Sequence, residues 1–512
     1  AGMIIKYNNN GIAQWSRTMS GSNITSILET EEGDYIVGGY CKNQPLELEN
    51  GNTINLDNTY NNGILIKYTK DGALKWVKSI GQAIYQISET KDKGCLVVGR
   101  YYKEQNLGND IKLEGLAHDG GMIVRYDKDG NAEWAKSIES SCRVELTSVK
   151  ETQDGGLIIG GIIVASSNVA GETIDLGNNV ILNVEERRDT AILVKYDKIG
   201  KAQWGRTFRT DYWSSEIGED NYWKMGIRTI IEESNGDIVV GGTYSGRNVD
   251  LGNGILLGKD YESETAILVK YNREGQTKWA KQILGKGMDK ESYINSVRKT
   301  QDGGYIVSGR FGFSQVDLGN GVVLNNNVEN SYHGDDYDEG LIVKYDNNGE
   351  AKWAKSIGGT YHDTINAVIE TDFGNYIAVG AFKSETIKLE NGQTLVNKGS
   401  IDAMILKLEE QMAGSEELEV LNTRKEFKII TDIEEMGGIK GGNISGEGEK
   451  PYEIVKYGDS NTKEIRMIPD ENYELIKITV NGQNYSFEKA ADGSYIMPAF
   501  KDITEDKNIV VT

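Results

Sequence analysis

Short segments of apolar and alternating residues recur along the first 410 residues, each bounded by Asn, Asp and Gly. Four such segments make a unit, typified by strand A in INAVIET (365–371), strand B in GYIVSGR (304–310), strand C in AILVKYD (191–197) and strand D in AKWAKSI (351–357). β-Branched and aromatic residues fill the segments and turn residues separate them, as in antiparallel strands. We therefore predict one four-stranded sheet for each unit.

The unit repeats six times with connections of variable length. Its most regular phrase joins strands C and D through a Gly-containing turn and ends on tryptophan, as in YDKDGNAEW (126–134). Repeated sheets of this size predict a β-propeller, and the tryptophans should pack each blade on the next. These blade-packing residues stand 58 to 75 positions apart and are Trp15, Trp76, Trp134, Trp204, Trp279 and Trp353.

The strand count leaves the number of blades open. Strands A and B occur six times, whereas strand C has an additional copy at residues 3–7. Either the strand around Trp15 completes the sixth blade, or the ring has seven blades with one truncated. Because the chain opens within a unit, we expect it to be a fragment of a longer protein.

A second motif lies between strands B and C of each unit. In VDLGNGVVL (316–324) and its counterparts, alternating apolar residues flank an Asn-Gly or Asn-Asn pair. Asn-Gly favours the type I′ turn of a short hairpin, so we expect a small added hairpin in every blade.

The composition changes near residue 413. All eight tryptophans lie at or before Trp353, and three of the four prolines (Pro451, Pro469, Pro498) follow the change. Strand-like segments such as EFKIITDI (426–433) continue without helical periodicity. We therefore predict an all-β chain, with a β-propeller at residues 1–413 and a small β-rich domain at 414–512.

Both parts resemble known bacterial families. The pattern DGGYIVGG, DLGNG and MIIKYDxNGxxxW in fixed order is similar to extracellular propeller repeats of Gram-positive surface proteins. The segments GGIKGGNISG (437–446) and MPAFKDITEDKNIVVT (497–512) resemble the divergent internalin B-repeat family, whose modules are stalk-like β domains. The resemblances imply an extracellular protein, secreted or attached to the cell wall, and neither family supplies catalytic residues.

Charge and cysteine content narrow the partners. A net charge of −22 disfavours nucleic acid and anionic membrane surfaces, and no apolar run is long enough for membrane insertion. Three scattered cysteines, Cys41, Cys95 and Cys142, make neither a disulfide framework nor a metal motif, and their disulfide state stays open.

The search for catalytic motifs returns none. The chain has three histidines, His118, His333 and His362, and no HExxH, GxSxG, Walker or GxGxxG pattern. A sialidase Asp-box needs Gly three residues before Trp, whereas Gly130 and Trp134 are four apart. That spacing fits the tryptophan-docking motif of quinoprotein dehydrogenases, but the adjacent cysteine pair common in those enzymes is missing. We expect no enzymatic activity and no cofactor.

Variable loops on a rigid scaffold are where binding residues concentrate. The B–C and D–A connections are long and share one face, and two of them depart from the repeat. Aromatic residues beside carboxylates suit sugar rings or protein hot spots, so we predict ligand-binding residues Tyr212, Trp213, Tyr222, Trp223, Tyr332 and His333. The acidic loop that follows offers hard oxygen ligands for Ca²⁺ at Asp335, Asp336 and Asp338.

The sequence thus predicts a non-enzymatic adhesion or binding module for a host or environmental glycan or protein. Within its longer chain we expect it to be a monomer. Two alternatives stay open: a polysaccharide-active propeller enzyme, with paired carboxylates near the channel mouth, and a purely architectural spacer.

Overall fold

We describe the fold from a computed structural model of the chain. The structure describes all residues except 1, 9–11, 43–45, 48–52, 55–60, 117–118, 165–170, 185–188, 209–225, 245–248, 259–263, 286–290, 327–337, 373, 409–425, 434–441, 445–452, 457–464, 471–474, 476, 481–482, 486–487, 491, 498–506 and 512. It divides into two compact units, Ala1–Ala413 and Gly414–Thr512.

The first unit is a six-bladed β-propeller, and its described residues form strands without helices. Blades 1 to 5 are four-stranded antiparallel sheets. Their strands A to D are β3(Ser22–Glu29), β4(Tyr35–Cys41), β7(Asn62–Tyr68) and β8(Leu74–Ser79); β9(Ala83–Glu89), β10(Cys95–Tyr101), β13(Gly120–Tyr126) and β14(Ala132–Ile138); β15(Arg143–Glu151), β16(Leu157–Val164), β19(Thr190–Tyr196) and β20(Ala202–Phe208); β21(Gly226–Glu232), β22(Ile238–Tyr244), β25(Thr265–Tyr271) and β26(Thr277–Ile283); β27(Ser292–Lys299), β28(Tyr305–Phe311), β31(Glu339–Tyr345) and β32(Ala351–Ile357).

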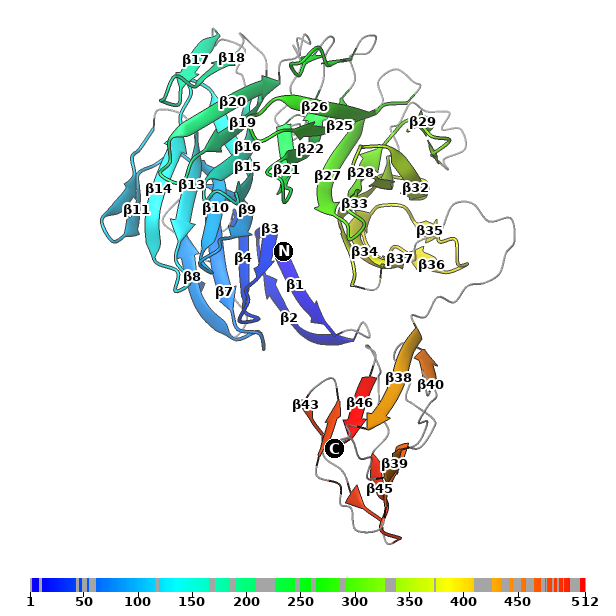
Figure 1. The fold of residues 1–512 in the computed structure, drawn as a ribbon. Helices are drawn as coiled ribbons and strands as arrows, with labels where there is room; N and C mark the ends of the chain where they lie inside the picture. The colour runs from blue at the N-terminus through cyan, green and yellow to red at the C-terminus, as the bar shows by residue number, and fades with distance from the viewer. Residues whose placement is uncertain are drawn as a thin grey trace. The chain divides into compact units, whose positions relative to one another are not determined.

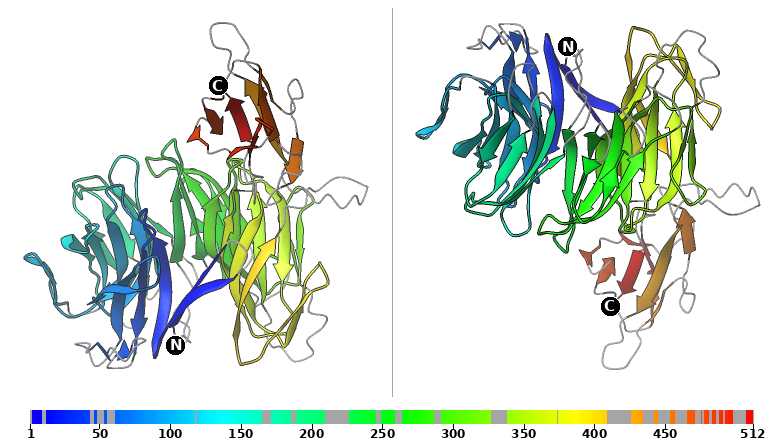
Figure 2. Two further views of the ribbon diagram at one scale, coloured as in Figure 1. Left: turned by 90° about the horizontal axis from the view of Figure 1, so that it is seen from below. Right: turned by 90° about the horizontal axis from the view of Figure 1, so that it is seen from above.

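Blade 6 has three strands in the described structure: β33(Asp363–Glu370), β34(Tyr376–Phe382) and β37(Asp402–Leu408). The N-terminal strands β1(Gly2–Tyr7) and β2(Ala13–Met19) pair with each other as a separate two-stranded sheet beside β3. The strand around Trp15 therefore pairs with β1 here, and no pairing of β2 with β37 is present among the described residues. The blades follow one another in sequence order around a common centre (Figures 1 and 2).

Between strands B and C each blade carries the expected small hairpin. At Gly319–Val322 the valine N–H donates to the glycine carbonyl, and both central residues, Asn320 and Gly321, have positive φ, as a type I′ turn requires. The hairpins lie at the outer rim (Figure 1), and several contact strand D of their own blade, so they cover its outer edge. They are β5(Leu46–Glu47)–β6(Thr53–Ile54), β11(Gln105–Gly108)–β12(Ile111–Leu113), β17(Glu172–Asp175)–β18(Ile181–Val184), β23(Val249–Asp250)–β24(Leu256–Leu257), β29(Gln315–Asp317)–β30(Val323–Asn325) and β35(Thr386–Lys388)–β36(Thr394–Val396).

The core lies between the blades, because each sheet is apolar on both faces. Ile306 and Ile342 of blade 5, for example, are fully buried in one cluster with Ile365 of blade 6. The tryptophan of one strand D packs on the C–D turn of the next blade. A β-carbon at Gly275 would lie 2.6 Å from the ring of Trp204, so this position needs glycine both for that contact and for its φ of 76°.

The three cysteines are buried and unpaired. Burial raises the pKa of Cys41 to about 11 and that of Cys95 to about 12. Both thiols are therefore held in their unreactive protonated form.

The second unit is a set of short strands in two sheets, one of five strands and one of four. Its small described core includes Ile465, Met467, Ile478 and Ile509. The strands are β38(Glu426–Ile433), β39(Gly442–Ile444), β40(Glu453–Lys456), β41(Ile465–Pro469), β42(Ile478–Val480), β43(Gln483–Asn484), β44(Glu488–Lys489), β45(Tyr495–Met497) and β46(Lys507–Val511).

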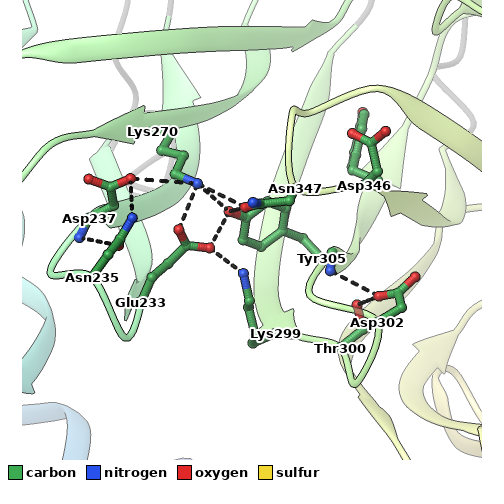
Figure 3. A network of polar contacts seen from close by, with 12 residues as sticks. Glu233, Asn235, Asp237, Lys270, Lys299, Thr300, Asp302, Tyr305, Asp346 and Asn347 are labelled. Atoms are coloured by element: carbon green, nitrogen blue, oxygen red, sulfur yellow. Dashed lines mark hydrogen bonds and ion pairs between the residues drawn. The ribbon is translucent and has the colours of Figure 1, made fainter.

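Blades 4 and 5 are joined by a buried ionic network at their short turns (Figure 3). In blades 1, 2, 3 and 6 strand A ends on a glutamate that is followed by threonine, and blade 4 keeps the glutamate as Glu232. At Glu151, Glu232 and Glu370 the carboxylate accepts a backbone N–H of the preceding blade at 2.6–2.7 Å. At this junction the pattern is exchanged, because Glu233 replaces the threonine of blade 4 and Lys299 replaces the glutamate of blade 5.

The two exchanged residues meet across the junction. Lys299 and Lys270 both contact the Glu233 carboxylate, the latter at 2.6 Å, and the Tyr305 hydroxyl donates to it at 2.5 Å. Burial penalises the charged form of Glu233, but its donors outweigh this cost and lower the pKa of Glu233. The exchange therefore replaces a backbone hydrogen bond with an ion pair between blades.

The Lys299→Glu variant should lose about 2–3 kcal/mol of unfolding free energy, because a second carboxylate would face buried Glu233. The double variant Glu233→Thr/Lys299→Glu restores the pattern of the other junctions and should recover most of that loss. Urea denaturation of the three proteins measures both effects. Arg273→Glu, at a side chain that is 75% exposed, is the matched control and should change stability little. A double variant as unstable as the single one would contradict this account.

Candidate functional site

The loop face, defined as the ends of the blades that carry the B–C and D–A connections, is the predicted binding face. Six predicted ligand-binding residues lie outside the described residues: Tyr212, Trp213, Tyr222, Trp223, Tyr332 and His333. The same holds for Asp335 and Asp336 of the predicted metal site. What the structure does describe on this face is two clusters of charged residues between blades.

Both clusters form at equivalent positions of the repeat. An arginine near the end of strand B, Arg100 in blade 2 and Arg310 in blade 5, faces an acid just before strand C, Asp119 or Asp338. Most remaining members lie at or just before the start of strand A in the same or an adjacent blade, and Glu264 lies just before strand C of blade 4. Adjacent repeats therefore build each cluster jointly.

The Tyr293 cluster consists of Arg228, Glu264, Glu291, Tyr293 and Arg310. The guanidinium carbons of Arg228 and Arg310 lie 5.2 and 4.4 Å from the centre of the Tyr293 ring, within cation–π range. The Tyr293 hydroxyl contacts the carboxylates of Glu264 and, at 2.5 Å, Glu291. Two cations and two carboxylates thus surround one buried phenol.

Tyr293 and Arg228 have shifted pKa values, and each keeps its ordinary protonation state at neutral pH. Burial and the two carboxylates raise the pKa of Tyr293 far above its usual value, so the phenol stays protonated. Burial lowers the pKa of Arg228 to about 10, which still leaves it charged at neutral pH. Because the phenol has one proton to donate, a ligand hydroxyl or amine can supply a further hydrogen bond to these carboxylates.

Asp338 lies beside the Tyr293 cluster and is nearly buried. Its carboxylate is 3.4 Å from the Arg310 guanidinium and 3.5 Å from Nδ1 of His362. In the part of the chain that the structure describes, no three His, Cys, Asp or Glu side chains are grouped as metal ligands would be. The side chains seen beside the Asp338 carboxylate are those of an arginine and a histidine, and calcium binding by the acidic loop stays a prediction.

The Glu145 cluster joins blades 2 and 3. Arg100 lies 3.4 Å from Asp119 and 3.3 Å from Glu145, and Arg143 lies 3.3 Å from the same Glu145 oxygen. Glu145 is only 3% exposed, and burial raises its pKa although both arginines oppose the shift. Burial and Glu145 also raise the pKa of Tyr85 strongly.

Polar side chains on strand A, the innermost strand of each blade, link neighbouring blades. Strand A of every blade has a β-bulge, and the extra residue of most blades bonds to the strand A that follows. Thr25 donates to the Ile84 carbonyl at 2.7 Å, and Arg228 donates to the Asn295 side chain at 2.8 Å. The bulge residues are Thr25, Tyr85, Thr147, Arg228, Asn295 and Asn366.

Motif searches missed these clusters because their members belong to different repeats. A signal was nevertheless present in the sequence. Where blades 2 and 5 have Arg100 and Arg310, the four other repeats have Tyr40, Ile162, Thr243 and Ala381. A charged residue at an otherwise uncharged repeat position marks a departure from the scaffold pattern.

Comparisons with known proteins assign no family to the chain. No protein-family profile matches the chain. It is 22% identical over 434 residues to an uncharacterised WD repeat-containing protein of Acanthamoeba polyphaga mimivirus, covering 79% of this chain and 28% of that protein's length. The chain therefore spans less than a third of that relative.

Solved structures with low similarity include two named bacterial proteins. The periplasmic gluconolactonase PpgL of Pseudomonas aeruginosa is 12% identical with a TM-score of 0.39, covering 79% of this chain and 98% of that one. BamB of Moraxella catarrhalis is 12% identical with a TM-score of 0.32, covering 74% and 88%. Such scores carry no argument about function. Among the described residues there is also no helix of the length and hydropathy needed to cross a membrane.

The Arg100→Met variant tests how far the stability of the fold depends on an arginine beside the buried Glu145 carboxylate. We expect Arg100→Met to lower the unfolding free energy by about 3 kcal/mol at pH 7, because the buried Glu145 carboxylate loses one of its two arginine partners. The pKa of Glu145, already raised, rises further, so the deficit should shrink as pH falls towards 4.5 and the folded state takes up the proton.

The control for this prediction is the double variant Arg100→Met/Glu145→Gln. It removes the buried charge and should recover most of the stability at pH 7. Urea denaturation between pH 4.5 and 8 measures both variants. A deficit that is independent of pH and persists in the double variant would show that Arg100 acts through packing alone.

Proposed function

We propose that this protein is a non-enzymatic binding module, secreted or attached to the cell wall, whose loop face recognises a glycan or a protein. The Tyr293 cluster carries the proposal. It gathers two guanidinium groups and two carboxylates around the buried Tyr293 ring at one face of a rigid propeller. Arg228 lies two residues after the predicted binding loop 208–226, and Asp338 lies within the second predicted loop, 331–340.

The chemistry of this set suits recognition. Arginine and tyrosine are the residue types enriched at binding hot spots, and the carboxylates can accept hydrogen bonds from sugar hydroxyls or from lysine and arginine of a partner. The carboxylates seen in these clusters already have cationic or phenolic neighbours. Such paired groups orient a ligand, whereas general acid–base catalysis needs a carboxyl group that is free to exchange protons.

The test is binding of the purified chain to a glycan array and to immobilised extracellular-matrix proteins. With a ligand in hand, Trp213→Ala and Trp223→Ala should each weaken binding at least about tenfold, as loss of an aromatic anchor does, without lowering Tm. Ile199→Ala is the matched control, since Ile199 lies in a C–D turn on the opposite face and is 69% exposed.

Two outcomes would count against the proposal. Full affinity in both tryptophan variants would remove the predicted loop 208–226 from the site. Loss of binding in Ile199→Ala would move the site to the turn face.

One observation favours a polysaccharide-active enzyme as a second candidate. Glu264 and Glu291 both contact the Tyr293 hydroxyl, so their carboxylates lie within roughly 5–6 Å of each other. Retaining glycosidases place their two carboxyl groups about 5–5.5 Å apart. Release of reducing ends from a polysaccharide panel, abolished by Glu264→Gln and by Glu291→Gln, would support this function, and no release would dismiss it.

A further inference from the structure

The last blade leaves an interior-type face uncovered. Ile369, Val379 and Ile405 on β33, β34 and β37 are 49%, 38% and 54% exposed. In blade 5 the residues at the positions of Val379 and Ile405 are Ser308 and Ile342, both 0% exposed beneath blade 6. These exposed apolar residues of blade 6 therefore lie on the face that the next blade covers at the other junctions.

The N-terminal strands β1 and β2 correspond to strands C and D of a blade. β1 and β2 pair with the same bulge, between Lys6 and Tyr7, that every complete blade shows between strands C and D. Ile4 packs in one cluster with Tyr35 of blade 1, and the Trp15 indole lies 5.6 Å from the Tyr35 ring. The pair is thus the C–D half of a sheet that precedes blade 1.

Apolar side chains beside β1 and β3 are exposed where strands A and B of a complete blade would cover them. Ile27 on β3 is 54% exposed, whereas the equivalent Ile87 and Val297 are 5% and 0% exposed because strands A and B of the preceding blade cover them. Met3 on β1 is 53% exposed, and its equivalent Ile64 is 0% exposed. The described pairings leave the second edge of β1 without a strand.

We propose that the second edge of β1 and the uncovered face of blade 6 together bind an antiparallel β-hairpin with the A–B pattern of this repeat. Its second strand would extend the β1–β2 sheet by adding to β1, as exposed edges accept strands in β-augmentation. One side of the hairpin would then cover Ile27, and the other would face Val379 and Ile405. The proposed hairpin covers both surfaces at once.

Charge adds a requirement for the turn of this hairpin. In complete blades the strand-C lysine, or Arg125 in blade 2, pairs with an aspartate of the A–B turn, as in Lys195–Asp154 at 2.9 Å and Lys344–Asp302 at 2.6 Å. The equivalent residue in β1 is Lys6, whose ammonium lies 5.1 Å from the centre of the Tyr35 ring. A hairpin with the turn Thr-x-Asp-Gly-Gly would supply the aspartate that the position lacks.

The chain's own β2 is a poorer occupant. Its register with β1 runs from Gly2 opposite Met19 to Tyr7 opposite Ala13, and Trp15 Nε1 donates to the Lys70 carbonyl at 3.1 Å. Moving β2 onto β37 would break the sheet with β1 and expose Ile4. An added hairpin breaks none of these contacts.

The test supplies such a hairpin to the full chain. Residues 291–311, which hold β27, its turn and β28, are fused before Gly2 through a linker of about six Gly and Ser residues. We expect Tm to rise by about 5 °C or more and the amides of β1 to become protected from hydrogen exchange. The same peptide added in trans should protect the same amides, which keeps the test valid if the fusion folds poorly.

Two controls define the outcome. A fusion whose copied segment carries Asp302→Lys should give a smaller rise in Tm, because it repels Lys6, and a fusion of scrambled sequence should give none. Absence of β1 protection in both the fusion and the trans experiment would overturn the proposal. So would a full chain in which β37 amides are already as protected as those of β31, since that would place β2 on β37.

Discussion

No blade of this propeller can bury its apolar residues alone. Each sheet carries apolar side chains on both faces, so burial is complete only when a sheet stands on either side. The clusters follow this constraint: Ile36 and Leu65 of blade 1 lie in one core with Ile87 and Val97 of blade 2. Stability is therefore a property of junctions, and the order of the repeats around the ring determines which side chains are covered.

The same constraint separates the scaffold from the candidate site. Positions buried in junctions keep small or apolar residues from repeat to repeat, whereas positions at the blade ends vary freely. Arg310 and Tyr293 use that freedom, and their ring and guanidinium contacts are formed on strands whose backbones the junctions hold rigid. A binding face built this way varies in chemistry while its geometry stays constant.

Much of the fold could be predicted from the sequence because its signals are local. Strand periodicity, the Asn-Gly hairpin turns and the regular Gly-to-Trp spacing each need only a few neighbouring residues. The partner of β2 could not be predicted, since a D-type strand around Trp15 reads the same beside β1 or β37. Members of the Tyr293 cluster, such as Arg228 and Arg310, meet only after the ring forms, so spacing along the chain could not show the site. The aromatic segments singled out beforehand lie outside the described residues and stay predictions.

The exchanged pair at the junction of blades 4 and 5 has a consequence for assembly. Near-identical repeats run the risk of docking in the wrong order during folding. Glu233 faces Lys299 in the correct order, but Glu29, Glu89, Glu151 or Glu370 occupies the same position in every other blade. Any other blade docked after blade 4 would set two carboxylates against each other. The reversal of charge at Lys299 thus favours blade 5 over the four other blades as the neighbour of blade 4. It does so without altering the shape of the repeat.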